Sequence, residues 1–266
     1  MDLQFLSDST FVLLLKKASI LAWVLFLAKK FILKPFIYNY IVNAIGTTRS
    51  HQKSKKYLDS LIHHTLFSIL SGIIMYSLYS CYRLQFFSLH SECEHYFYTL
   101  IDFIYVAQLA YYICGAIELL FDDSTSLVLM ILHHMVTIVL IIWSYPEFRM
   151  YGIFIMAIHD IPDVFLDLFK LAEYSKHERV CKFAYFCLLF TFIGLRIGLL
   201  PYEILRKEIN IGLEIDDELK IHCLLWILIA LHIYWSYLII LVGCRAMNGK
   251  KLVDIREQQS KKKKER

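Results

Sequence analysis

Several features that mark common protein classes are missing from this 266-residue chain. Its seven cysteines include no CxxC pair and no finger-like spacing, so we expect neither a disulfide framework nor a structural zinc site. The first ten residues, MDLQFLSDST, carry no positive charge, and we therefore expect no cleavable signal peptide. There is also no internal repeat and no low-complexity linker. The organisation of the chain must therefore come from its apolar segments.

Apolar residues dominate the composition, at 58% of the chain with a mean hydropathy of +0.52, against about 45–50% apolar residues in soluble proteins. They come in blocks of roughly 20 residues, long enough to cross a hydrocarbon core of about 30 Å as helices. We therefore predict an all-α, polytopic membrane bundle of about seven transmembrane helices. The predicted spans are residues 10–33, 60–82, 97–120, 125–145, 149–170, 182–203 and 221–244.

Positive charge alternates between the connections of these spans. The loop TTRSHQKSKK has four Lys or Arg, residues 170–182 have four, and the tail from Arg245 has nine, whereas the alternate connections are poorer. The positive-inside rule then predicts a lumenal N-terminus and a cytosolic C-terminus. In the tail, QQSKKKKER, Lys263 and Lys264 resemble a dilysine signal for retrieval to the endoplasmic reticulum, where we expect this multi-pass protein. The other interpretation is a basic tail attracted to anionic lipid headgroups.

Ionisable side chains interrupt two of the most apolar spans. The fourth span, LVLMILHHMVTIVLIIWSY, contains His133 and His134, with Thr137 on the face of His133. The fifth span carries His159, Asp160, Asp163 and Asp167. The spacing of these residues places them along one side of a helix. Three aspartates facing lipid would cost on the order of 8–10 kcal/mol, so they are expected to face the interior of the bundle.

The two sets of polar residues are predicted to lie at one depth. His133 and His134 are roughly 12–14 Å from the start of the fourth span, at about 1.5 Å per residue. The fifth span runs in the opposite direction, and Asp160 and Asp163 are roughly 10–15 Å from its cytosolic end. We therefore expect a single buried polar site in which these histidines and carboxylates meet.

The same residues resemble the signature of the ceramide synthases, within the larger TLC-domain membrane family. The likeness runs from HHMVTIVLIIWSY through Gly152 to HDIPDVFLDLFK. KKYLDSLIHHTLFSI, Arg196 with Pro201, and WILIALHIYWSYLII are similar to other parts of that family. The chain departs from the family at Asp167, where glutamate is usual, and in lacking a tryptophan in the opening of the second span. A homeobox-like insert and a long N-terminal region, found in some animal members, are also absent.

The resemblance implies transfer of a fatty acyl group from acyl-CoA to the amine of a long-chain sphingoid base, giving a (dihydro)ceramide. Such an amine must lose a proton before it attacks a thioester, which calls for a base. A histidine can be that base, or can carry the acyl group itself. In this hypothesis His133 or His134 is nucleophile or base and His159 is its partner in proton transfer. Asp160 and Asp163 orient these rings.

The resemblance also assigns supporting residues. Asp167 and Lys170 would line the cytosolic mouth, where Lys170 could meet CoA phosphates, and Arg196 would be the counter-charge of the aspartates. The remaining signature positions, taken as substrate-binding or supporting, are Thr137, Ser144 and Tyr145. A second histidine pair, His63 and His64, is interpreted as hydrated and structural, because it lies near the predicted cytosolic face.

The expected organisation follows from this hypothesis. Residues 1–56 form an N-terminal span and a basic cytosolic loop, 57–245 a TLC-type catalytic bundle, and 246–266 a basic cytosolic tail. Acyl-CoA is a co-substrate, and no further cofactor and no metal is expected. The expected partners are acyl-CoA, a long-chain sphingoid base and membrane lipids, with no nucleic acid; a homodimer or a regulatory subunit remains open.

Three other functions compete with this interpretation. A di-iron hydroxylase or desaturase needs about eight histidines in spaced boxes, which the chain lacks. A non-catalytic TLC-domain protein, acting in lipid sensing or protein translocation, generally does not keep the full set of histidines and aspartates. A proton-coupled transporter would also place His and Asp in the membrane, but the chain shows no repeat symmetry.

Overall fold

The computed structural model describes residues 9–28, 31, 36, 39–45, 51–83, 90–119, 127–145, 148–211, 216–248 and 251–253. Within these ranges every regular element is a helix. Some sequence predictions fall outside the described residues. They concern the first eight residues, part of the basic loop after the first span, and the tail with Lys263 and Lys264.

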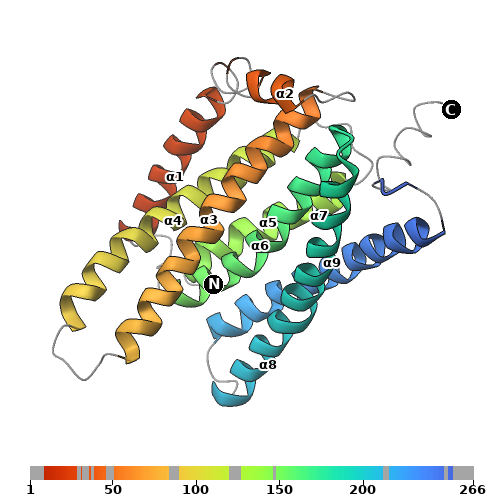
Figure 1. Cartoon of the computed structure of the whole chain (residues 1–266). Coiled ribbons are helices and arrows are strands. Elements are labelled where there is room, and N and C mark those ends of the chain that lie inside the picture. Colours follow the sequence, from red (N-terminus) through yellow and green to blue (C-terminus); the bar gives the residue numbers. More distant parts are fainter. Residues whose placement is uncertain are drawn as a thin grey trace.

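Ten helical elements make up the described part of the chain (Figure 1). They are α1 (Ser9–Ala28), α2 (Asn39–Ile45), α3 (His51–Arg83), α4 (His90–Leu119), α5 (Leu127–Ser144), α6 (Arg149–Tyr174), α7 (Glu178–Thr191), η3 (Phe192–Leu199), α8 (Leu200–Ile211) and α9 (Asp216–Met247). Since α7, η3 and α8 follow one another without a break, they form one continuous rod. Counted this way, each predicted span coincides with one long helix, and the all-α polytopic fold is confirmed.

Five of these helices are long and apolar enough to cross a membrane, within the part of the chain that the structure describes. These segments are Ser54–Tyr76, Thr99–Leu119, Leu127–Ser144, Glu178–Arg206 and Lys220–Met247. Two predicted spans, the first (α1) and the fifth (α6), are not among them. In α6 the three aspartates interrupt the apolar run. Its position explains how those aspartates are tolerated: α6 packs along α3 and α7 and also contacts α5 and η3.

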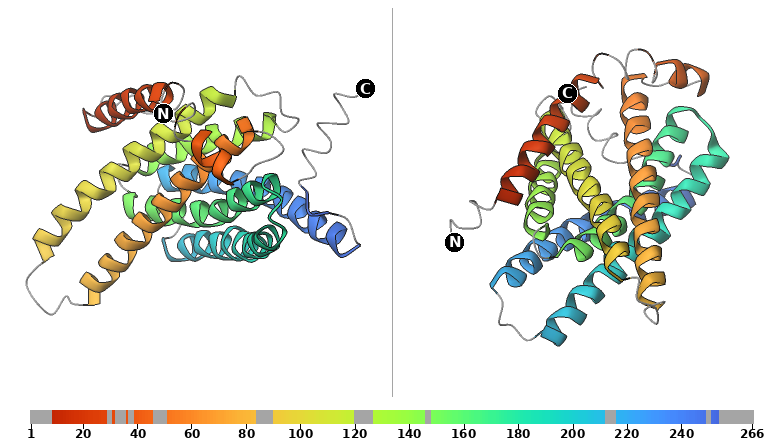
Figure 2. Two further views of the ribbon diagram at one scale, coloured as in Figure 1. Left: turned by 45° about the horizontal axis from the view of Figure 1, so that its top comes forward. Right: turned by 90° about the vertical axis from the view of Figure 1, so that its left-hand side faces the viewer.

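The core consists of two large apolar clusters that share α5 and α6. One joins them to α1, α3 and α4, around Tyr105 and Ile153. The other joins them to η3, α8 and α9, around Leu228 and Trp235. In the left view of Figure 2, α3 and α4 extend to one side of the molecule and α9 to the other. The shared helices thus lie between the two halves of the bundle, where the polar residues of α5 and α6 are shielded from lipid.

Two prolines shape the helices that carry polar residues. Pro162 lies inside α6 and, having no N–H, leaves the carbonyl of Ile158 without its usual helical donor. Pro201 is the second residue of α8, which directly follows the π-helical segment η3 that contains Arg196. A proline ring clashes with the carbonyl four residues earlier, and widening the preceding turns relieves that clash. The π-helical turns therefore set the direction in which Arg196 leaves the rod.

Candidate active site

Three buried histidine rings gather where α5, α6 and α9 meet. The ring centroids of His159 and His232 are 5.0 Å apart, and those of His133 and Trp235 are 5.3 Å apart. His232 in turn lies 6.0 Å from Trp235. None of the three histidines is more than 8% exposed. The structure therefore places His133 and His159 in one buried region, with α9 supplying a third ring.

The hydrogen bonds of His159 define its neutral tautomer. Its Nδ1 lies 2.7 Å from the carbonyl oxygen of Ile155, which can only accept, so Nδ1 carries the proton. Its Nε2 is buried and has no hydrogen-bond partner among the described residues. The free lone pair on Nε2 is the feature that a base or a nucleophile needs.

His134 points elsewhere, although it neighbours His133 in sequence. Its Nδ1 lies 2.9 Å from the carbonyl of Met130, and its Nε2 lies only 2.9 Å from where a Cβ on Gly115 would be. The ring therefore packs against α4, in the space that a glycine leaves. The two histidines of the pair have different surroundings, and only His133 reaches the group of rings around Trp235.

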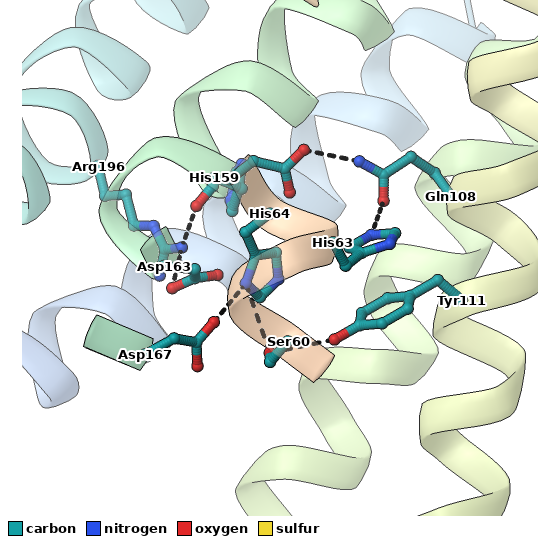
Figure 3. Close-up of polar contacts among 10 residues, drawn as sticks. Ser60, His63, His64, Gln108, Tyr111, His159, Asp163, Asp167 and Arg196 are labelled. Atoms are coloured by element: carbon teal, nitrogen blue, oxygen red, sulfur yellow. Dashed lines mark hydrogen bonds and ion pairs between the residues drawn. The ribbon is translucent and has the colours of Figure 1, made fainter. Parts of the chain in front are cut away.

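The three aspartates of α6 have partners other than the histidines that the sequence suggested. Figure 3 labels two of them, Asp163 and Asp167, with their partners. Arg196 pairs with Asp163 at 2.7 Å and also bonds the backbone carbonyl of His159. Asp167 receives a 2.8 Å hydrogen bond from His64, and Asp160 receives one of 2.6 Å from Gln108. The expectation that Asp160 and Asp163 orient the rings of His133, His134 or His159 is not met. The expected counter-charge, Arg196, is in place.

The second histidine pair belongs to this polar region, which corrects its interpretation as hydrated surface. His64 is only 8% exposed and pairs with Asp167. His63 stacks on Tyr111 with centroids 3.4 Å apart, and its Nε2 lies 3.2 Å from the side-chain oxygen of Gln108. Figure 3 shows both rings directed from α3 toward α6 and α4. The polar region therefore extends across α3 and α4 as well as α5 and α6.

A narrow cavity of about 40 Å³ lies beside these residues. His159 and Asp160 contribute to its wall together with Gln108, Thr137 and Ser144. The remainder of the lining is mainly apolar: Leu140, Ile141, Ile155, Met156, Ile221, Leu225 and Leu228. This space suits a group the size of a few water molecules, so a long alkyl chain enters only if the surrounding helices separate.

The remaining predicted residues have structural partners. Ser144 and Tyr105 share a 3.0 Å hydrogen bond, and Tyr145 packs under the guanidinium of Arg149 at 4.4 Å. Thr137 donates to the backbone carbonyl of His133 at 2.8 Å. The Tyr105–Ser144 bond joins α4 to α5 and the Tyr145–Arg149 contact holds the start of α6, whereas the bond of Thr137 lies within α5.

Lys170 differs from the expectation. It is 1% exposed, with its Nζ 5.8 Å above the ring of Tyr57, whereas the sequence placed it at an open mouth. Asp167 is likewise buried. Neither side chain lines an open mouth in this structure.

Sequence reasoning missed His232, Gln108 and His64 as parts of this region. The sequence does contain an indication of a buried role for His232 and Gln108, since each is a lone polar residue inside an apolar span. His64 lies near the end of its span, where a hydrated histidine is unremarkable, so only the packing of α3 on α6 reveals its role. Among the described residues, no group of three or more His, Cys, Asp or Glu side chains has the arrangement to hold a metal ion.

Comparison with known protein families identifies the family to which the chain belongs. The TLC domain family matches residues 53–241, which is most of the chain and includes all the helices that form the site. The protein belongs to the TLC-domain family. Among curated proteins, human ceramide synthase 5 is 33% identical over 153 residues, covering 54% of this chain and 38% of the relative. Ceramide synthase LOH2 of Arabidopsis thaliana is 32% identical over 176 residues, covering 59% and 57%.

The match to these relatives is partial. Ceramide synthase 1 LOH3 of Arabidopsis thaliana is 34% identical over 115 residues, covering 39% of this chain and 37% of the relative. The chain thus spans less than two thirds of the length of each of these relatives. The family is established, and the reaction of this TLC-domain protein is treated as a proposal below.

Proposed function

We propose that this TLC-domain protein is an acyl-CoA-dependent N-acyltransferase of the ceramide synthase type. Its substrates are a fatty acyl-CoA and a long-chain sphingoid base, and its product is a (dihydro)ceramide. The observation that carries the proposal is the free Nε2 of His159, buried at the wall of a largely apolar cavity. The similarity to human and plant ceramide synthases supports the choice of substrates.

The reaction has a fixed proton balance. A sphingoid ammonium reacts with a thioester to give an amide, free CoA thiol and one proton. In the direct route, Nε2 of His159 takes a proton from the ammonium. The neutral amine then attacks the thioester carbonyl, the C–S bond breaks, and the leaving thiolate takes the second proton from the attacking nitrogen. The first proton remains on His159, next to His232, whose ring lies 5.0 Å away; His133 lies on the other side of Trp235.

A two-step route uses the same atom differently. Here Nε2 attacks the thioester and CoA leaves as the thiolate, which takes a proton from the substrate ammonium. The acyl group stays on the imidazole until the neutral amine displaces it and gives up one proton. Both routes leave Nδ1 hydrogen-bonded to Ile155 throughout. Intact mass of the purified protein after incubation with acyl-CoA alone separates them, since only the two-step route leaves an acyl adduct.

The pairing of buried charges around His159 favours a catalytic role for these residues over a purely structural one. Arg196 both pairs with Asp163 and holds the carbonyl of His159 at 2.5 Å, so it ties the carboxylate to the backbone of the proposed base. Interhelical hydrogen bonds alone need no such buried arginine. We also propose that the protein works in the membrane of the endoplasmic reticulum, with its N-terminus lumenal and its C-terminus cytosolic.

The test is N-acyl product formation by purified protein in detergent, with palmitoyl-CoA and sphinganine as probes. We expect the wild type to form the amide and His159→Gln to lose about 10²- to 10⁴-fold in rate, the usual contribution of a general base. His177→Gln is the matched control, because His177 is exposed and lies outside the site. Equal rates for folded wild type and His159→Gln would refute the role of His159, and no product from the wild type would refute the activity.

A further inference from the structure

The acidic residues of α6 differ in how their charges are compensated. Asp163 has the guanidinium of Arg196 at 2.7 Å, and Asp167 has the imidazole of His64 at 2.8 Å. Asp160 has neither: its one hydrogen bond from a described residue comes from the neutral amide of Gln108. It is also the most deeply buried of the three, at 1% exposure. A buried carboxylate without a cation is costly, so its retention calls for a partner.

Asp160 is also the aspartate that reaches the cavity. It contributes to the wall together with His159 and Gln108, whereas Asp163 and Asp167 do not. The volume of about 40 Å³ accommodates a head group such as an ammonium. The apolar lining that follows, including Leu140 and Leu228, suits the first carbons of an attached chain.

Two further residues fix the direction of this carboxylate. Gln108 is fully buried, and its side-chain oxygen accepts a hydrogen bond from Nε2 of His63 at 3.2 Å. Because the oxygen is taken in this way, the amide nitrogen must turn to Asp160. His63 is itself held by stacking on Tyr111, as Figure 3 shows. His63 on α3 therefore orients Gln108 on α4, and Gln108 in turn orients Asp160 on α6.

We propose that Asp160 binds the ammonium group of the long-chain amine substrate, and that Gln108 and His63 are positioning residues that hold this carboxylate toward the cavity. The identity of the amine rests on the proposed function. The binding itself does not, since a carboxylate in an apolar pocket selects a cation over a neutral group of the same size. An ammonium bound there lies beside His159, the proposed acceptor of its proton.

The experiment compares two probes that differ only in charge. The purified full chain in detergent is titrated with octadecylamine and with 1-octadecanol at neutral pH, and affinities are corrected for partition into empty micelles. A hydrogen bond to a charged group predicts that the wild type prefers the amine by about 10- to 100-fold. In Asp160→Asn the preference falls to about one, because volume and hydrogen bonding remain but the charge is gone.

Three more variants sharpen the result. Glu203→Gln is the matched control, because this carboxylate pairs with Arg206 on α8 and does not contribute to the cavity wall; its preference stays within about threefold of the wild type. His63→Phe keeps the stacking on Tyr111 but removes the donor to Gln108, so amine affinity falls severalfold while octadecanol affinity is unchanged. Gln108→Lys gives Asp160 a cation from the protein itself and abolishes the preference; it serves if Asp160→Asn does not fold.

The outcomes separate this inference from the proposed function. An amine preference that persists in folded Asp160→Asn or Gln108→Lys overturns the inference, as does a wild type without any preference. If the preference depends on Asp160 but no amide product forms, the acyltransferase function fails and the ammonium site stands. If product forms and the preference ignores Asp160, the ammonium site fails and the function stands.

Discussion

Gly152 provides a quantitative test of how the start of α6 packs on α4 and α5. A Cβ at this position would collide with the hydroxyl of Tyr105 and would lie 2.8 Å from Oγ of Ser144. Gly152→Ala therefore forces Tyr105 away and breaks its 3.0 Å hydrogen bond with Ser144. Overpacking costs about 1–3 kcal/mol and the lost hydrogen bond about 0.5–1.5 kcal/mol. Alanine has a more favourable helix propensity than glycine by about 1 kcal/mol, so the net loss of stability is roughly 0.5–3.5 kcal/mol.

The clash can be isolated with a double-mutant cycle. Tyr105→Phe removes the colliding oxygen, so the double variant with Gly152→Ala should be more stable than the sum of the single effects by about 1–2 kcal/mol. Gly72→Ala is the control, because no atom lies within 4 Å of its added Cβ, and it should raise stability by up to about 1 kcal/mol. The measurement is unfolding in detergent followed by tryptophan fluorescence. Additive effects within about 0.5 kcal/mol, or an unaffected Gly152→Ala, would refute this packing.

Two other stability predictions follow from buried contacts. His64→Leu leaves Asp167 as a buried charge without a partner and should lower the free energy of unfolding by about 3–5 kcal/mol. The double variant with Asp167→Leu should recover most of that loss. Equal unfolding midpoints for the single and double variants would contradict the pair. Gly243→Ala should destabilise by about 1–3 kcal/mol, because its Cβ meets the hydroxyl of Tyr185. Tyr185→Phe should relieve part of that cost, and a Gly243→Ala variant as stable as the wild type would count against the contact.

The positions of the helices could be predicted from the sequence because hydropathy determines them locally. The apolar runs predict each long helix to within a few residues, apart from the extension of α3 back to His51, of α4 back to His90 and of α9 back to Asp216, and the continuation of α8 to Ile211. The i, i+4 spacing of the α6 aspartates correctly placed them toward the interior. These features depend only on helix geometry and on the cost of charge in lipid.

The partners of those aspartates could not be predicted in the same way. Spacing defines the face of one helix but not which neighbouring helix covers that face. The sequence alone therefore pairs the carboxylates with the histidines of the span that adjoins in sequence, His133 and His134. In the structure α3 and η3 cover that face and contribute His64 and Arg196. Lys170 was placed at an open mouth for a related reason, since position along a span gives depth but not lateral burial.

The central claim of the account is that this chain joins an acyl group to a long-chain amine within the site around His159. The most direct measurement uses palmitoyl-CoA labelled with ¹³C at the carbonyl, purified protein and sphinganine, with mass spectrometry of the lipids and assay of the released thiol. The account predicts labelled N-acyl sphinganine and free CoA in equal amounts. Labelled free fatty acid in place of the amide, or no thiol release above that of protein-free micelles, would contradict it.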